Sequence, residues 1–132
     1  MSKIAPQGSP RLEALLFAAD AKIDEHGAAS LTRLCDRVFV PHGAKETGKL
    51  WLFVRLAGLP DGRTQIGVKI AGPDGRLIAE LKKTDKASAA PYAVQFVAPF
   101  SMPISGEGAY RFEVTRFGLP VGSADLIVEF IH

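Results

Sequence analysis

The sequence predicts an all-β fold, an antiparallel sandwich of about eight strands, and two observations support this prediction. Apolar residues recur at every second position between turn signals, which is the spacing of a strand with one buried face. The chain also carries 13 Gly and 9 Pro among its 132 residues, so turns are frequent. No long window shows the spacing of an amphipathic helix.

The alternation of apolar and polar residues locates the individual strands. In the clearest case, Tyr110, Phe112 and Val114 alternate with polar residues, which predicts one face against a core and one toward solvent. The same alternation places Leu126 and Val128 on the inner face of the last strand. We expect strands at about residues 11–22, 28–40, 49–58, 63–72, 76–82, 91–99, 109–117 and 123–131.

Two Pro-Asp-Gly sequences, at 60–62 and 73–75, predict tight turns. Pro presets φ, Asp bonds the nearby backbone, and Gly accepts a positive φ. The first turn would close a hairpin that sets Val54 against Val68. The second would set Val68 against Glu80, an unfavourable pair, so we expect a bulge or an early end of the strand there.

The segments between the strands are expected to be turns and loops. Residues 24–27 would form a hairpin turn. Residues 82–90 lack strand character and would form a crossover loop whose lysines are solvated. Residues 1–10 would be a flexible lead-in, and residues 11–132 would form one β-sandwich domain.

The composition argues against several classes of partner. The 16 Lys+Arg and 14 Asp+Glu give a net charge of +2, too balanced for a dedicated nucleic-acid or membrane-surface binder. The N-terminal residues lack the apolar core of a signal peptide, and the apolar runs are too short to span a bilayer. The single Cys fits a reducing compartment. We therefore expect a cytoplasmic protein that contacts neither nucleic acid nor membrane.

One acidic cluster is a candidate metal site. Asp20, Asp24, Glu25 and His26 are the densest group of possible ligands for a hard cation. Turns, however, select Asp for backbone reasons, so a solvated hairpin tip is the favoured interpretation. We expect no metal and no cofactor.

Catalysis is the least favoured interpretation. It would require Cys35, His42 and an acid such as Asp36 to converge in a cleft. Arg33 and Arg37 flank the cysteine and would favour its thiolate form if the strand were regular. A lone Cys in a strand is usually a small apolar filler, so we expect no catalytic residue.

The segment 49–56 departs from simple alternation because both of its faces are apolar. The core-facing positions are Leu50, Leu52, Val54 and Leu56. Trp51 and Phe53 then occupy the outer face beside Arg55, and the predicted hairpin would add Lys69 to that face. Contiguous apolar surface of this kind marks a partner site. We therefore predict partner contacts at Trp51, Phe53, Arg55 and Lys69.

Three occupants are possible for this outer face: the rest of the chain, a second copy, or a foreign partner. The strand at 11–22 is also apolar on both faces, which favours a homo-oligomer. The favoured function is a non-enzymatic protein-interaction or assembly module that binds itself or another protein. The alternative is a module that binds a small ligand, such as a carbohydrate, at the loop end near His42, Trp51 or Tyr92.

Several segments resemble known proteins. Residues 15–21 (LLFAADA), 27–31 (GAASL) and 36–41 (DRVFVP), with the turn at 72–75, resemble a family of small bacterial proteins of unknown function. Residues 108–114 (GAYRFEV) resemble the penultimate strand of immunoglobulin-like sandwiches. The resemblance implies an immunoglobulin-like β-sandwich and assigns neither a catalytic residue nor a cofactor.

Overall fold

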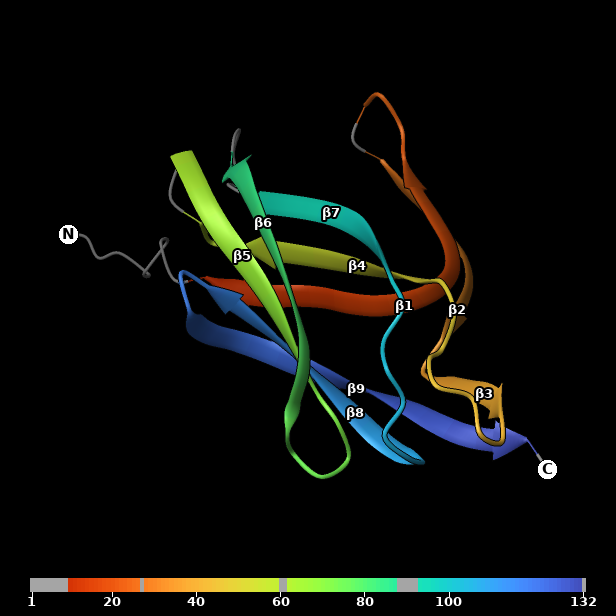
Figure 1. Cartoon of the computed structure of the whole chain (residues 1–132). Helices are drawn as coiled ribbons and strands as arrows, with labels where there is room; N and C mark the ends of the chain where they lie inside the picture. The colour runs from red at the N-terminus through yellow and green to blue at the C-terminus, as the bar shows by residue number, and fades with distance from the viewer. Residues whose placement is uncertain (1–9, 27, 60–61, 88–92, 132) are drawn as a thin grey trace.

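The computed structural model describes residues 10–26, 28–59, 62–87 and 93–131, which form nine β-strands in two sheets (Figure 1). The strands are β1 (Arg11–Ile23), β2 (Ala29–Cys35), β3 (Arg37–Pro41), β4 (Leu50–Ala57), β5 (Gly62–Ala71), β6 (Leu77–Ala87), β7 (Ala93–Phe100), β8 (Gly108–Arg116) and β9 (Leu119–Ile131). In the described part of the chain there is no helix that could cross a membrane. Apart from Pro10, the predicted lead-in at 1–10 lies outside the described residues.

The strands divide into a four-stranded sheet A, in the order β2-β1-β4-β7, and a five-stranded sheet B, in the order β3-β9-β8-β5-β6. Strand β3 pairs in parallel with β9, whereas the other paired strands run antiparallel. Figure 1 shows β3 beside the C-terminal part of β9. The predicted all-β sandwich is confirmed.

The strand expected at 28–40 is two strands that belong to different sheets. Arg33 takes a positive φ of 59°, which interrupts the regular pairing of β2 with β1. Asp36 is a bend, and its carbonyl oxygen accepts a hydrogen bond from the Ile127 N–H at 3.0 Å. The chain therefore leaves sheet A after Cys35 and enters sheet B at Arg37, which raises the strand number above the expected eight.

The predicted hairpin of β4 with β5 is wrong. Strand β4 pairs with β1 and β7, whereas β5 pairs with β6 and β8. Val54 and Val68 therefore belong to opposite sheets, and both lie in the shared core, 0% and 1% exposed. A β4–β5 hairpin would place the two strands side by side in one sheet. In the observed sandwich they belong to different sheets, and the apolar face of each strand is buried in the interior between the sheets.

The turn at 72–75 forms as predicted. The Gly72 N–H donates to the Arg76 carbonyl oxygen and the Gly75 N–H donates to the Gly72 carbonyl oxygen, both at 2.9 Å. Gly75 has a φ of 84°, a conformation that favours glycine. The expected bulge is also present, between Ile70 and Ala71.

The bulge changes the partners along β5 and β6. It sets Val68 opposite Leu81, so that an apolar pair replaces the predicted contact of Val68 with Glu80. The loop predicted at 82–90 is wrong over residues 82–87, which continue β6. Pairing with β5 as far as Gly62 supplies their backbone hydrogen bonds, which outweighs their polar composition. Residues 88–90 lie outside the described part of the chain.

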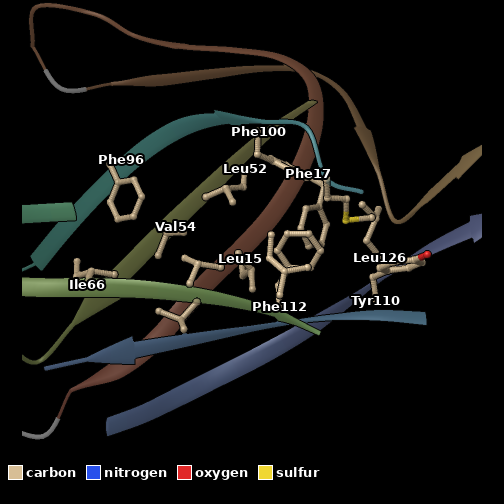
Figure 2. Packing of buried hydrophobic residues seen from close by; sticks show 14 of the residues in the cluster. Leu15, Phe17, Leu52, Val54, Ile66, Phe96, Phe100, Tyr110, Phe112 and Leu126 are labelled. Carbon is tan, nitrogen blue, oxygen red and sulfur yellow. The ribbon is translucent and has the colours of Figure 1, made fainter. Parts of the chain in front are cut away.

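The inner faces of both sheets form one continuous core (Figure 2). Its largest fully buried side chains are Tyr110, Phe112, Leu52, Leu56, Leu59, Ile66, Ile70, Met102, Leu126, Val54, Val68 and Val114. Phe112 of sheet B packs edge to face on Phe17 and Phe100 of sheet A, with ring centroids 4.7 Å and 5.4 Å away. Such aromatic pairs add to the stabilisation from burial and hold the two layers together.

Candidate protein-interaction surface

The outer face of sheet A carries two rows of apolar side chains that cross the strands. The register aligns Leu34, Ala18, Trp51 and Pro99 in one row. It aligns Leu16, Phe53 and Val97 in the next row. We define the sheet A patch as Leu16, Leu34, Trp51, Phe53, Val97 and Pro99.

Exposure varies across the sheet A patch. Phe53, near its centre, is 9% exposed, whereas Leu16 is 38% and Leu34 60% exposed. Trp51 and Val97 are half-buried. A central aromatic residue with open apolar neighbours is the arrangement expected of a protein interface before its partner binds.

A polar row borders the patch on the side of the β1 N-terminus. Arg55 donates from Nε to Glu13 Oε1 at 2.8 Å and from Nη1 to Gln95 Oε1 at 3.0 Å. Arg11 approaches the same carboxylate at 3.3 Å. The hydrogen bond from Arg55 lowers the pKa of Glu13, against a smaller opposing effect of burial. Arg55 is therefore held in place across three strands, as a pre-ordered rim residue.

Lys49 borders the patch at its other end. Its Nζ lies 5.0 Å from the centroid of the Trp51 ring. A cation over an indole face stabilises the pair by roughly 0.5–1 kcal/mol at exposed sites. The Lys49 ammonium group thus helps to hold the orientation of the Trp51 ring.

The structure brings together three of the four predicted contact residues. Trp51, Phe53 and Arg55 share the outer face of sheet A, as expected. The prediction that Lys69 joins them is wrong, because it depended on the absent β4–β5 hairpin. Lys69 lies on the outer face of sheet B, opposite Glu80 and Glu113, and lines a separate hollow of about 260 Å³.

The contributions of β1 and β7 to this surface were not predicted. Residues 11–22 have two apolar faces, as predicted, but a bulge between Leu12 and Ala14 divides the residues between them differently. Leu12 points to the core with Leu15, and Leu16 points outward. Pro99 is the sequence signal that marks β7 as an edge strand, since proline cannot donate a hydrogen bond to a neighbouring strand.

Cys35 is placed as an inward-facing apolar filler rather than as a nucleophile. It lies opposite Phe17 and packs against the core. Burial, and then the Asp36 carboxylate, raise the pKa of the thiol, which opposes thiolate formation. The neighbouring Arg37 is ion-paired with Glu129, and the His42 ring packs on Phe130 at 5.2 Å.

The acidic cluster forms a hairpin turn, as predicted. Asp24 Oδ1 accepts hydrogen bonds from the backbone N–H groups of His26 and Ala28, at 2.8 Å and 3.0 Å. The carboxylate thus serves the turn itself. Among the residues described, no three His, Cys, Asp or Glu side chains are grouped to hold a metal ion.

The three aromatic residues of the alternative ligand site are not gathered on one described surface. His42 follows β3 of sheet B, whereas Trp51 lies on sheet A. Tyr92 lies outside the described residues. Of the three residues, His42 thus follows a strand of sheet B and Trp51 belongs to sheet A.

The comparisons with known proteins concern the fold. No protein-family model matches the chain, and no curated protein matches it. Among solved structures, the C-terminal domain of Wzt is similar over 95% of this chain and 75% of that chain, at 11% identity and a TM-score of 0.54. An immunoglobulin-like protein from Pseudomonas aeruginosa is similar over 93% and 98%, at 15% identity and a TM-score of 0.49. The predicted β-sandwich is confirmed as the fold of this chain.

Proposed function

We propose that this domain is a non-enzymatic protein-interaction module that docks a second copy of itself through the sheet A patch. The supporting observation is the pair of apolar rows on the outer face of sheet A, one crossing all four strands and the other crossing β1, β4 and β7. Leu34 and Leu16 leave much of that surface open to water. A contiguous apolar surface of this kind is uncommon on a monomer and typical of a binding site.

The edges of the sheets oppose association by strand addition. Pro99 lacks an N–H group that β7 could donate to another strand, and Arg33, with a positive φ of 59°, makes β2 irregular. Strand β6 carries Lys82 and Lys83, and lysines on an edge strand discourage pairing with another chain. Because β2, β6 and β7, three of the four edge strands, are protected in these ways, the outer face of sheet A is the better docking surface.

A second copy fits the shape and symmetry of this face. Sheet faces pack on each other with interdigitating side chains. In a two-fold dimer the same patch lies on both sides of the interface, so each apolar row can pack on its own equivalent. Arg55, already fixed by Glu13 and Gln95, would close the rim without a further loss of side-chain entropy.

The test compares two exposed leucines on opposite sheets. Leu34 in the sheet A patch is 60% exposed, and Leu77 on sheet B is 58% exposed. Light scattering over a concentration series should show a dimer for the unmodified chain. Leu34→Lys should raise the dimer dissociation constant about tenfold or more, since a lysine would be desolvated in the interface. Leu77→Lys should leave it unchanged.

Two results would overturn the proposal. One is a monomer at every concentration, which would leave the patch to a foreign partner. The other is an equal effect of the two lysine substitutions, which would assign the association to general apolar exposure.

A further inference from the structure

A second feature lies at the seam where the two sheets end side by side. Sheet A ends at β7 and sheet B ends at β6, and Figure 1 shows these edge strands next to each other. A cavity of about 320 Å³ opens at this seam. Its apolar wall includes Ile66, Val68, Leu81, Phe96 and Ala98. Figure 2 shows Phe96 and Ile66 projecting into the interior from opposite sheets.

A lysine occupies an inward-facing position at this opening. Lys83 on β6 is paired in register with Ile66, which is 1% exposed, so the lysine side chain shares the inner face of the sheet. Its Nζ lies 5.6 Å from the centroid of the Phe96 ring. Lys82 lines the same cavity from the outer face of β6. Among the described side chains, neither lysine forms an ion pair.

We propose that the seam binds a small amphipathic carboxylate, with its apolar body between the sheets and its carboxylate on Lys83. The volume is at the lower end of the range of about 300–1,000 Å³ that is typical of ligand sites, which suits a short acyl chain or a single ring. Apolar walls favour burial of the hydrocarbon part. Lys83 is exposed at the mouth of the cavity, where its ammonium group can form a charge-assisted hydrogen bond to a carboxylate.

Protection of an edge strand is the competing explanation for Lys83. Inward-pointing charges on edge strands block pairing with other chains. Edge protection requires only the positive charge of Lys83. It predicts no difference in affinity between a carboxylate and a neutral molecule of the same length. The ligand proposal predicts such a preference, which depends on Lys83.

The experiment titrates the full chain with octanoate and, separately, with 1-octanol, followed by methyl and amide NMR. Octanoate should give saturable shifts at the methyl groups of Ile66, Val68 and Ala98. It should bind at least about tenfold more tightly than 1-octanol, a difference of about 1.4 kcal/mol. Lys83→Met retains the length of the side chain without its charge and should remove this preference. Lys45→Met, an exposed lysine outside the seam, should leave both affinities unchanged.

Three results would overturn the proposal: equal affinity for the two probes, unchanged octanoate binding in Lys83→Met, or shifts centred on the Trp51 indole. The last would mean adsorption to the sheet A patch. The NMR spectrum of each variant reports its folding directly. Val97 and Pro99 belong both to the sheet A patch and to the cavity lining. Binding at the seam is therefore read at Ile66 and Val68 of sheet B, and loss of dimerisation in Leu34→Lys would leave that readout intact.

Discussion

The outer faces of the two sheets differ although both sheets contribute to one core. On sheet A, Leu16 and Phe53 lie in one cross-strand row, and Trp51 lies in the next. On sheet B, the equivalent row sets Lys69 between Glu80 and Glu113. One face is a strip of apolar groups, and the other alternates positive and negative charges.

This difference shows that the apolar content of sheet A is not needed to build the sandwich. The charged row on sheet B is compatible with complete burial of Val68 and Ile70 on the other side of the same strand. A polar row on the outside of sheet A would be equally compatible with burial of Leu52 and Val54. The apolar outer face therefore calls for an explanation outside the fold, and binding is the explanation that we propose.

The largest expected effect comes from the core that both sheets share. Phe112→Ala removes a fully buried ring that contacts Phe17 and Phe100. We expect the free energy of unfolding to fall by about 3–5 kcal/mol, measured by denaturant titration. A loss below about 1 kcal/mol would show that the two layers do not depend on this contact.

The second prediction separates association from stability on sheet A. Trp51→Ala should weaken dimerisation by about 2 kcal/mol or more, the scale of an interface hot spot. Sedimentation equilibrium measures this change, with Leu77→Ala on sheet B as the control. If Trp51→Ala stays folded and associates as before, the sheet A patch is not the interface.

The third prediction concerns the charged face of sheet B. A Cβ added at Gly67 would lie 2.7 Å from Thr115 Oγ1, too close for an unstrained contact. Gly67→Ala should cost about 1–3 kcal/mol of stability through overpacking. It should leave the dimer dissociation constant unchanged, as measured by light scattering under native conditions. A parallel loss of association would contradict the separation of the two faces.

The smallest expected effect is the pH dependence of the polar row on sheet A. The hydrogen bond from Arg55 holds the folded-state pKa of Glu13 below its unfolded value of about 4.3. Stability from this pairing is present above the unfolded pKa and is lost as the pH falls through the folded pKa. Glu13→Gln should therefore lose less stability than the unmodified chain on acidification, in urea titrations at several pH values. An identical acid slope would show that the pair contributes nothing measurable.

The inner faces of the strands could be predicted from the sequence because their signal is local. The period of two in Tyr110, Phe112 and Val114 requires only neighbouring residues, and these positions are 0% exposed. The outward position of Trp51 and Phe53 could be predicted in the same way, because it follows from the alternation of residues within β4 alone.

The pairing partners could not be predicted because they depend on the whole chain. A Pro-Asp-Gly sequence is compatible both with a hairpin and with a crossing between sheets, so Lys69 was assigned to the wrong face. Lys82 and Lys83 made a strand resemble a loop, since the polar residues of a protected edge strand have the composition of a loop. Arg33 carries no local signal for the positive φ at which β2 becomes irregular.

The parallel pairing of β3 with β9 has a consequence for how the chain acquires its structure. Arg37 and Glu129, which join these strands, are 92 positions apart. During synthesis β3 emerges long before β9, which is its only described neighbour in sheet B. The hydrogen bonds between β3 and that sheet can therefore form only after β9 has been made. Pairings between distant segments are slow to form because the intervening loop must be closed first. The final closure of sheet B should therefore follow the emergence of β9 from the ribosome, because β9 is the strand on which β3 pairs.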